Sequence, residues 1–452
     1  MTITTLYSAR WVLPISGAPI EDGAVAVEGA HIAGVGTRAA LRARFPEAVA
    51  QEFGEAAILP GLVNCHSHLE LTVMRGYLEE GDFSAWLKKL TRARLERMTP
   101  DDFYVSAAWG AVEAAHAGVT CLGDASDAAS ASLTALSDVG LRGIVYQESF
   151  GPDPRVAHKH FEELREKIAR LRELECERVR AGVSPHAPYT VSAPQLELIS
   201  EFALSEQLPM MMHAAESEAE TRLMLEGRGS FADGLAQRGI EWRAPGISTI
   251  QYLARHNVLR ARPLLAHCIR VDETDMETIK EAGAAVAHCP KSNAKLGHGR
   301  APYAAFVQSG ITTGLGSDSV ASNNTCDILE EARFAVMLSR AGSDRVSEGR
   351  MISADDALKT ATLGGARALG LDHQTGALAE GLQADLTVVA LTGAHQMPVY
   401  EPANALIYAS SGRDVLLTMV AGREVYRDGH VRHIDEERLR ARMKEIARKM
   451  SK

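Results

Sequence analysis

Eight short apolar runs, separated by polar loops and amphipathic helical segments, constrain the fold of this chain more than any other feature. Most of the runs are continuously hydrophobic, as strands covered on both faces are, rather than alternating between apolar and polar residues. The runs span residues 57–65, 119–125, 143–148, 181–185, 209–213, 263–267, 284–288 and 312–317. Eight parallel strands that alternate with helices predict an α/β fold in which the strands close into a (β/α)₈ (TIM) barrel.

The two ends of the chain do not fit this alternation. Short β-like runs separated by turns occupy residues 1–56 and again residues 375–435. A sandwich built from either segment alone would be small and marginal, so we expect both to meet in one composite β-sandwich beside a barrel of residues 57–374. The charged amphipathic stretch 436–452 predicts a solvated C-terminal helix.

Composition excludes several classes of function. A net charge of −10 opposes binding to nucleic acids or anionic membranes, which needs a basic surface. No apolar run approaches the roughly 20 residues that span a bilayer, and the first residues lack the pattern of a signal peptide. The six cysteines have neither the spacing of a disulfide framework nor that of a zinc ribbon. We therefore expect a cytoplasmic protein with reduced thiols, whose partner is a small-molecule substrate and not a nucleic acid or a membrane.

His66 and His68 lie two residues apart, directly after the first apolar run. Side chains on a strand repeat with a period of two, so both imidazoles point the same way. Neutral imidazole is the commonest metal ligand in proteins, which makes the pair a candidate half of a metal site. Such pairs also occur by chance, so the interpretation depends on partners elsewhere in the chain.

Further histidines and one aspartate end the later apolar runs. The active site of a (β/α)₈ barrel lies at the C-terminal ends of its strands, where such side chains converge. A lone histidine at a strand end is usually structural, but six of the eight runs end in a histidine or an aspartate. The later residues are His186, His213, His267, His288 and Asp318. Their shared level in the barrel predicts a metal site.

The residue types indicate a catalytic site. Three imidazoles and one carboxylate leave a coordination position open for water, unlike the closed set of a structural site. Bound to Zn²⁺, water has its pKa lowered towards ~7, which supplies hydroxide at neutral pH. Glu216 follows His213 by three residues and is placed to transfer protons. The alternative for Glu216 is an ordinary charged residue in the first turn of a helix.

With these strand-end residues the chain resembles the amidohydrolase superfamily, in its branch of mononuclear nucleobase and nucleoside deaminases. That branch includes adenosylhomocysteine/methylthioadenosine, aminodeoxyfutalosine and guanine deaminases, and triazine hydrolases. The resemblance implies that one divalent metal ion is bound by His66, His68, His213 and Asp318. It also implies that Glu216 is the general acid/base, that His267 steers the attacking water and that His186 contacts the substrate. Binuclear relatives use a carboxylated lysine after the fourth strand; here no lysine occurs between Lys167 and Lys280, so one metal is expected.

The reaction that the resemblance implies is hydrolytic deamination. Activated water attacks the carbon bearing the exocyclic amine of an aromatic N-heterocycle, and Glu216 gives a proton to the adjacent ring nitrogen. His267 and Asp318 stabilise the adduct and help to protonate the departing ammonia. We expect an adenine nucleoside-type substrate (aminodeoxyfutalosine, adenosylhomocysteine or an adenosine-like compound). The alternatives are a guanine or pterin deaminase, or a triazine-type chlorohydrolase or amidohydrolase on the same site. Zinc is the expected metal and Fe²⁺ the alternative, since both accept these ligands.

The loops give weaker predictions about substrate contacts. Phe83 and Trp86 are three residues apart at the start of a helix, so they share a face that either walls the pocket against a flat ring or anchors the helix. Related deaminases place a ribose-binding glutamate further along this helix. The candidate substrate contacts are Arg75, Trp86, Glu96 and His186. Lys291 and His298, in the loop after the seventh run, either meet a carboxylate or phosphate or are solvated, and we favour the solvated loop for both. Related enzymes are usually homo-oligomers, and we expect the same here.

Overall fold

The computed structural model describes residues 3–79, 83–341 and 351–451. The parts of the predicted segments that fall on residues 1–2, 80–82, 342–350 and 452 lie outside this description. The strands are β1 Thr4–Val12, β2 Ile20–Glu28, β3 His31–Thr37, β4 Val49–Glu52, β5 Ala56–Pro60, β6 Leu62–Ser67, β7 Val119–Ser126, β8 Arg142–Ser149, β9 Val179–Pro185, β10 Met211–Ala214, β11 Leu264–His267, β12 Ala285–His288, β13 Thr313–Leu315, β14 Leu386–Ala390, β15 Val415–Val420, β16 Arg423–Arg427 and β17 His430–Val431. The helices are α1 Arg38–Arg44, α2 Phe83–Arg97, α3 Pro100–His116, α4 Ala129–Val139, α5 Ala157–Arg172, α6 Ala193–Ser205, α7 Glu218–Glu226, α8 Ser230–Gln237, α9 Thr249–Arg255, α10 Glu273–Ala282, α11 Pro290–Lys295, α12 Tyr303–Ser309, α13 Val320–Asn323, α14 Ile328–Ala341, α15 Ala354–Lys359, α16 Gly365–Ala368, α17 Pro402–Asn404 and α18 Glu436–Met450. None of the helices in these three ranges has both the length and the apolarity that crossing a membrane requires.

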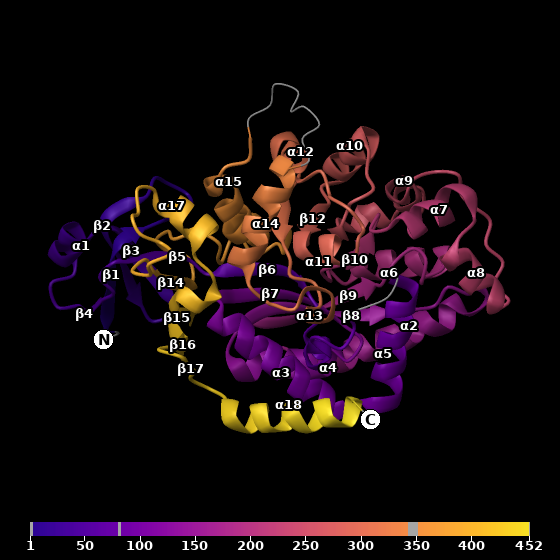
Figure 1. Ribbon diagram of the computed structural model, residues 1–452, viewed down its shortest axis with the longest axis horizontal. Coiled ribbons are helices and arrows are strands. Elements are labelled where there is room, and N and C mark those ends of the chain that lie inside the picture. Colours follow the sequence, from indigo (N-terminus) through magenta and orange to yellow (C-terminus); the bar gives the residue numbers. More distant parts are fainter. Residues whose placement is uncertain (1–2, 80–82, 342–350, 452) are drawn as a thin grey trace.

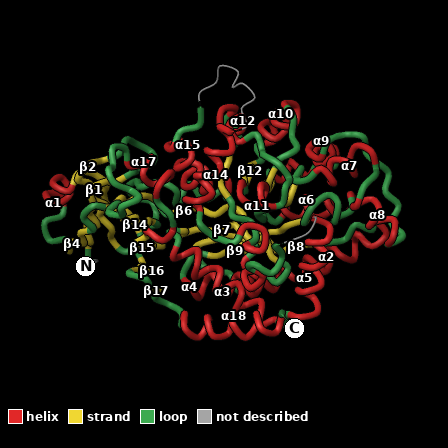
Figure 2. The backbone as a smooth tube through the Cα atoms, in the orientation of Figure 1, coloured by secondary structure: helices red, strands yellow, loops and turns green. Residues whose placement is uncertain are grey.

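Strands β6 to β13 form the barrel, with helices covering its outside (Figures 1 and 2). Hydrogen bonds join them in two parallel groups, β6-β7-β8-β9 and β10-β11-β12-β13. A parallel bridge between Val183 and Met210 links the groups on one side, and a second between Ser67 and Asp318 links them on the other. The predicted (β/α)₈ barrel is therefore confirmed, and the second bridge already brings Asp318 to the end of β6.

The first apolar run forms two strands rather than one. Residues Ala56–Pro60 form β5 in the terminal sheet, and Leu62–Ser67 form the first barrel strand. Gly61 separates them: its N–H donates to Asp385 O, and a Cβ at this position would lie 2.0 Å from Thr120 Oγ1. The expected single strand 57–65 is wrong for this reason, and the boundary between sheet and barrel lies at Gly61 rather than at residue 57.

The two ends of the chain meet in one β unit, as expected. Its described strands are hydrogen-bonded in the order β17-β16-β15-β14-β5-β1-β2-β3, with β4 paired to β1. The ends join where β5 pairs antiparallel with β14, placing Ile58 opposite Val388. In Figure 1 the indigo N-terminal strands and the yellow C-terminal strands accordingly lie side by side. Ile58 and Val388 are fully buried in the apolar core of this unit.

Helix α18 lies along the outside of the barrel, against α3 (Figure 1). Leu439, Ile446 and Met450 bury one face of the helix, while its other face is charged and exposed. Lys449 Nζ lies 2.7 Å from Asp102 Oδ2, in the first turn of α3. The predicted C-terminal helix is confirmed, but one of its faces is docked rather than solvated.

A buried ion pair connects the barrel to the terminal sheet, and we expect its loss to destabilise the fold. Arg142, at the start of β8, donates from Nε to Asp385 Oδ2 at 2.7 Å and from a terminal nitrogen to Asp385 Oδ1 at 3.2 Å. The two side chains are 4% and 0% exposed, so Arg142→Ala leaves an uncompensated buried carboxylate. Breaking such a pair costs about 3–5 kcal/mol, which urea unfolding would measure. Arg42→Ala, which removes an exposed partner of Glu52, should leave the curve unchanged; equal effects of the two substitutions would contradict the prediction.

Candidate active site

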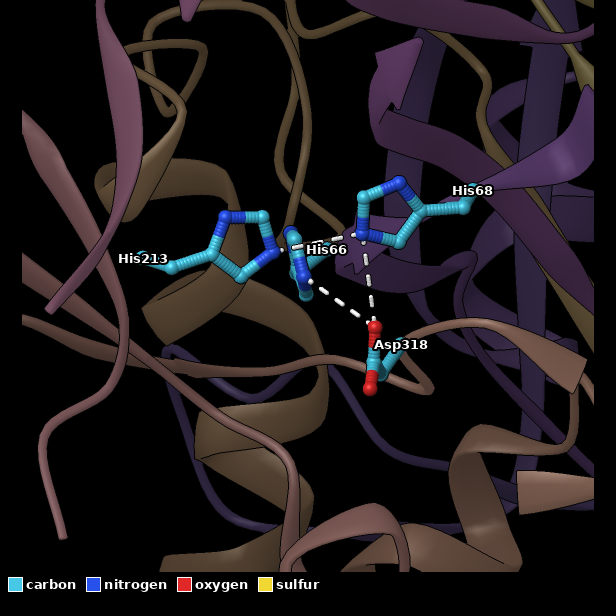
Figure 3. Close-up of side chains that lie close together, drawn as sticks. All are labelled: His66, His68, His213 and Asp318. Atoms are coloured by element: carbon cyan, nitrogen blue, oxygen red, sulfur yellow. Dashed lines mark hydrogen bonds and ion pairs between the residues drawn. The ribbon is translucent and has the colours of Figure 1, made fainter. Parts of the chain in front are cut away.

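Three imidazoles and one carboxylate meet at the C-terminal end of the barrel (Figure 3). One ligand atom from each of four residues lies within 4.8 Å of the others; the residues are His66, His68, His213 and Asp318. The Nε2 atoms of His68 and His213 are 3.3 Å apart. Asp318 Oδ1 lies 3.3 Å from His66 Nε2 and 3.4 Å from His68 Nε2. The structure therefore brings together all four residues that the resemblance names as metal ligands.

These separations fit a single divalent ion. Ligand atoms about 2.0–2.1 Å from one ion in a tetrahedral arrangement are about 3.3–3.4 Å from each other. Apart from its 3.3 Å approach to Asp318 Oδ1, His66 Nε2 is buried and has no hydrogen-bond partner among the described residues, as expected of a nitrogen that binds a metal. Burial, helped by the charge of His66, lowers the pKa of His68 to about 3, so this imidazole is neutral and able to coordinate. The four residues are therefore a group that could hold one divalent metal ion.

Backbone and side-chain hydrogen bonds hold the strand ends in this arrangement. Asp318 N donates to His66 O at 2.9 Å, so β6 and the end of β13 are fastened together beside the ligands. Asp124, on β7, accepts from Ser67 Oγ and from Leu69 N, both at 2.8 Å, and so fixes the loop that carries His68. His213 Nδ1 lies 2.9 Å from His186 O, which turns its Nε2 towards the other ligands.

Asp318 is held ionised and oriented. Its Oδ2 accepts from Ser292 Oγ at 2.5 Å and from Ser322 Oγ at 2.8 Å, so Oδ1 is left to face the imidazoles. Burial alone would raise the pKa of Asp318, but the neighbouring histidines, His66 first, hold it well below its usual value. Asp318 and His267 both have a left-handed backbone, with φ of 57° and 74°. Such strain in residues other than glycine gathers at functional sites, where the surrounding structure enforces it.

Glu216 lies beside these ligands, with its Oε1 3.6 Å from His267 Nε2. Burial raises the pKa of Glu216 to about 7, although His267 opposes the shift. A carboxyl group with a pKa near neutrality can both accept and donate a proton, as a general acid/base must. His267 Nδ1 lies 2.8 Å from Asn293 Oδ1, and this contact directs Nε2 towards Glu216. The structure therefore places both predicted catalytic groups at the site.

A cavity of about 280 Å³ opens over the metal ligands. Its polar lining includes His68, Glu70, Arg94, Glu148, His186, His213, Glu216, His267 and Asp318. Its apolar lining includes Leu71, Phe83, Trp86, Leu87, Leu90, Phe150, Tyr189 and Leu296. Two of the predicted substrate contacts, His186 and Trp86, line this cavity, and Phe83 and Trp86 stack with ring centroids 6.0 Å apart. The interpretation of these two aromatic residues as a pocket wall agrees with their placement.

Arg75 and Glu96, the other two expected substrate contacts, do not line the cavity. Arg75 precedes α2 and forms an ion pair with Glu113 of α3. Glu96 is exposed on α2 and pairs with Arg92. Trp86, Leu90 and Arg94 follow one another at intervals of four residues and face inwards, whereas Glu96 lies about 200° around the helix from Arg94. Arg94, not Glu96, faces the cavity, and Arg75 is held by Glu113. The expectation that Glu96 and Arg75 contact the substrate is therefore corrected.

Sequence reasoning also missed or misjudged other residues at the site. His298 is 7% exposed, its Nε2 lies 3.6 Å from Glu216 Oε1, and its ring meets that of Phe83 edge-on at 4.5 Å. The expectation of a solvated His298 was wrong, because a ring from the distant α2 covers it. Lys291 turns away from the cavity, to Glu330 and Thr325. Glu148 lines the cavity but was not among the predicted site residues. It ends the third apolar run, so the search for polar residues at strand ends could have found it.

His298 and His267 flank the same carboxylate oxygen, and we expect both to influence turnover. In His298→Asn, Glu216 loses one of two adjacent imidazoles, so kcat should fall about tenfold or more while KM changes little. Steady-state kinetics of product release would measure both constants. His256→Asn, which removes an imidazole paired with Glu197 on the surface, is the matched control. A variant of His298 with unchanged kcat would contradict the prediction.

Comparison with known proteins gives a consistent assignment. The sequence pattern of the amidohydrolase family matches residues 57–425, and that of a bacterial imidazolonepropionase-like composite domain matches residues 23–48. The chain is 34% identical to the 5-methylthioadenosine/S-adenosylhomocysteine deaminase of Nitratidesulfovibrio vulgaris, over 95% of this chain and 93% of the relative.

Solved structures share the fold over nearly the full length. A zinc-bound adenosine deaminase from Xanthomonas campestris has a TM-score of 0.88 at 27% identity, with 99% of each chain covered. A zinc complex of an atrazine chlorohydrolase from Arthrobacter aurescens has a TM-score of 0.84 at 23% identity, covering 98% of this chain and 100% of that one. The chain belongs to the amidohydrolase family and is a hydrolase that acts on C–N bonds.

Proposed function

We propose that this chain is a zinc-dependent deaminase that releases ammonia from the exocyclic amine of an adenine nucleoside-type compound. The observation that carries the proposal is the convergence of four metal-ligand side chains with Glu216 and His267 at one end of a cavity walled by aromatic rings. Relatives named for deaminating 5-methylthioadenosine and S-adenosylhomocysteine support the substrate class.

Zinc is the proposed occupant. Three of the separations between ligand atoms are 3.3–3.4 Å, the edge length of a tetrahedron around an ion with the bond lengths of zinc, and the similar adenosine deaminase structure contains zinc. When bound, the ion supplies a coordinated water whose pKa is lowered towards ~7. The ligand set, His66, His68, His213 and Asp318, is part of the proposal.

Glu216 and His267 would then carry out the proton transfers of the reaction. Glu216 takes a proton from the attacking water and gives it to the ring nitrogen next to the amine-bearing carbon, which its pKa of about 7 allows. The carboxylates of Glu216 and Asp318 raise the pKa of His267 against the effect of its burial. A raised pKa favours the protonated form of His267, which can stabilise negative charge and pass a proton to departing ammonia. His186 and Trp86 hold the heterocycle in the cavity.

The proposed setting is the cytoplasm of the cell. The six cysteines are free and five of them are buried, which suits a reducing compartment. The homo-oligomer that the resemblance implies stays an expectation.

A substrate panel tests the proposal. Zinc-loaded protein would be incubated with adenosine, 5-methylthioadenosine, S-adenosylhomocysteine, aminodeoxyfutalosine, guanine, pterin and a chlorotriazine, and ammonia and chloride would be measured. We expect ammonia from adenine nucleosides. Failure of every adenine nucleoside to release ammonia would contradict the proposal. Release of chloride alone would contradict it too, and would favour a triazine-type reaction at the same site.

A further inference from the structure

The cavity wall holds a buried carboxyl group, Glu148, with one oxygen that is unpaired among the described residues. Glu148 ends β8, is 4% exposed, and lines the cavity. Its Oε1 is buried and accepts no hydrogen bond from any residue that the structure describes. A buried acceptor left unpaired costs free energy, so native structures rarely keep one without a reason. A bound ligand that donates a hydrogen bond would supply the missing partner.

The nearest cation does not satisfy Glu148. Arg94, which also lines the cavity, donates one terminal nitrogen to Glu70 Oε1 at 3.2 Å and the other to Asp127 Oδ2 at 2.9 Å. Burial, followed by the charge of Glu70, raises the pKa of Glu148 well above its usual value. The guanidinium of Arg94 is thus already paired with two other carboxylates. This end of the cavity repels an anionic substituent and accepts a neutral group with O–H or N–H donors.

Glu148 also lies on a particular side of the reaction site. One of its carboxyl oxygens is within 4.8 Å of a ring nitrogen of His186 and of His213. Glu216 and His267 approach the metal ligands from β10 and β11, whereas Glu148 and His186 come from β8 and the end of β9. Adenosine carries hydrogen-bond donors only in its amine and in its sugar hydroxyls. With the amine held at the metal-ligand group, the hydroxyls are the donors that remain to meet Glu148.

Helix α2, over its described residues, does not present a carboxyl group to the cavity that could accept hydrogen bonds from a substrate. Its polar residues at the cavity are Arg94, which has donors and no acceptor, and Thr91, which offers a single hydroxyl, while Glu96 points to solvent. Hydroxyl groups need an acceptor, and a carboxyl group can accept from two adjacent hydroxyls at once. We propose that Glu148 accepts hydrogen bonds from the sugar hydroxyls of the substrate, and so selects an amino-heterocycle bearing a neutral ribose over the free base. This inference rests on the proposed deaminase function.

A comparison of substrates and variants tests the assignment. Initial rates would be measured with adenosine, 2′-deoxyadenosine, 3′-deoxyadenosine and adenine for the unaltered protein and for Glu148→Ala and Glu148→Gln. Each missing hydroxyl should lower kcat/KM of the unaltered protein by about 3- to 10-fold, the effect of one hydrogen bond between uncharged groups. Glu148→Ala should lose the same factor with adenosine and discriminate little between adenosine and its deoxy forms. Glu163→Ala, which removes an exposed carboxylate on α5, should behave as the unaltered protein does.

The possible results separate the two claims. Equal rates for adenosine, its deoxy forms and adenine in the unaltered protein would overturn the role of Glu148 while leaving deamination intact. A Glu148→Ala variant that loses the same factor with every substrate would overturn it too. If that variant fails to fold, shown by its thermal midpoint and metal content, the deoxy series in the unaltered protein and Glu148→Gln decides. Absence of ammonia from every compound would instead overturn the proposed function.

Discussion

Glu216→Gln should keep its metal and release ammonia about 10²- to 10⁴-fold more slowly than the unaltered protein. The substitution preserves the shape of a buried side chain but removes the group that takes and gives the proton. None of the four ligand atoms belongs to Glu216, so metal binding should persist. Ammonia release under saturating substrate and metal analysis of the same sample would measure both quantities.

The control for this prediction lies two residues away. Glu218 is exposed and pairs with Arg222 on α7, so Glu218→Gln makes the same chemical change outside the cavity. It should retain full activity. A Glu216→Gln protein with normal kcat would show that another group moves the proton, and one without metal would show that the carboxylate supports the ligands instead.

Removal of the metal should abolish ammonia release and lower the thermal midpoint. Without an ion, the site buries three imidazoles and a carboxylate, and three pairs of their ligand atoms lie only 3.3–3.4 Å apart. An ion at 100 times its Kd stabilises the folded state by about 2.7 kcal/mol, and chelation removes that contribution. Activity and melting would be followed during chelation and after addition of Zn²⁺, which should restore both.

His213→Ala is the matched variant for this experiment. It deletes one proposed ligand, so neither its activity nor its melting should respond to chelator or zinc. His288→Ala removes a buried histidine that stacks on Tyr303 and lies outside the ligand group. That protein should keep its response to metal. Loss of the response in both variants, or in neither, would contradict the ligand assignment.

The fold was predictable because the barrel strands are buried on both faces and therefore read as continuous apolar runs. β7 and β8, for example, are buried at every residue. The convergence of the strand-end side chains was predictable for a related reason: parallel strands end at one face of the barrel, so residues far apart in sequence meet there. The error at Gly61 arose because two consecutive strands of different sheets form one apolar stretch with a single glycine between them.

Substrate contacts were less predictable, since they depend on how loops and helices pack against the barrel. The rotation of α2 about its axis decides whether Arg94 or Glu96 faces the cavity. Charged residues occur on both the buried and the exposed side of this helix, so the sequence pattern does not reveal that rotation. His298 is buried by Phe83, more than 200 residues earlier, a contact that no local pattern reports. Glu148 differs, because its position at a strand end was visible in the sequence.

The most direct test of the account is ammonia release from an adenine nucleoside, measured as metal-free protein is titrated with Zn²⁺. One ion held by His66, His68, His213 and Asp318 predicts a rate that rises linearly and reaches its plateau at one zinc per chain. A plateau at two ions, or a rate that does not depend on zinc, would contradict a deaminase with a single metal at this site.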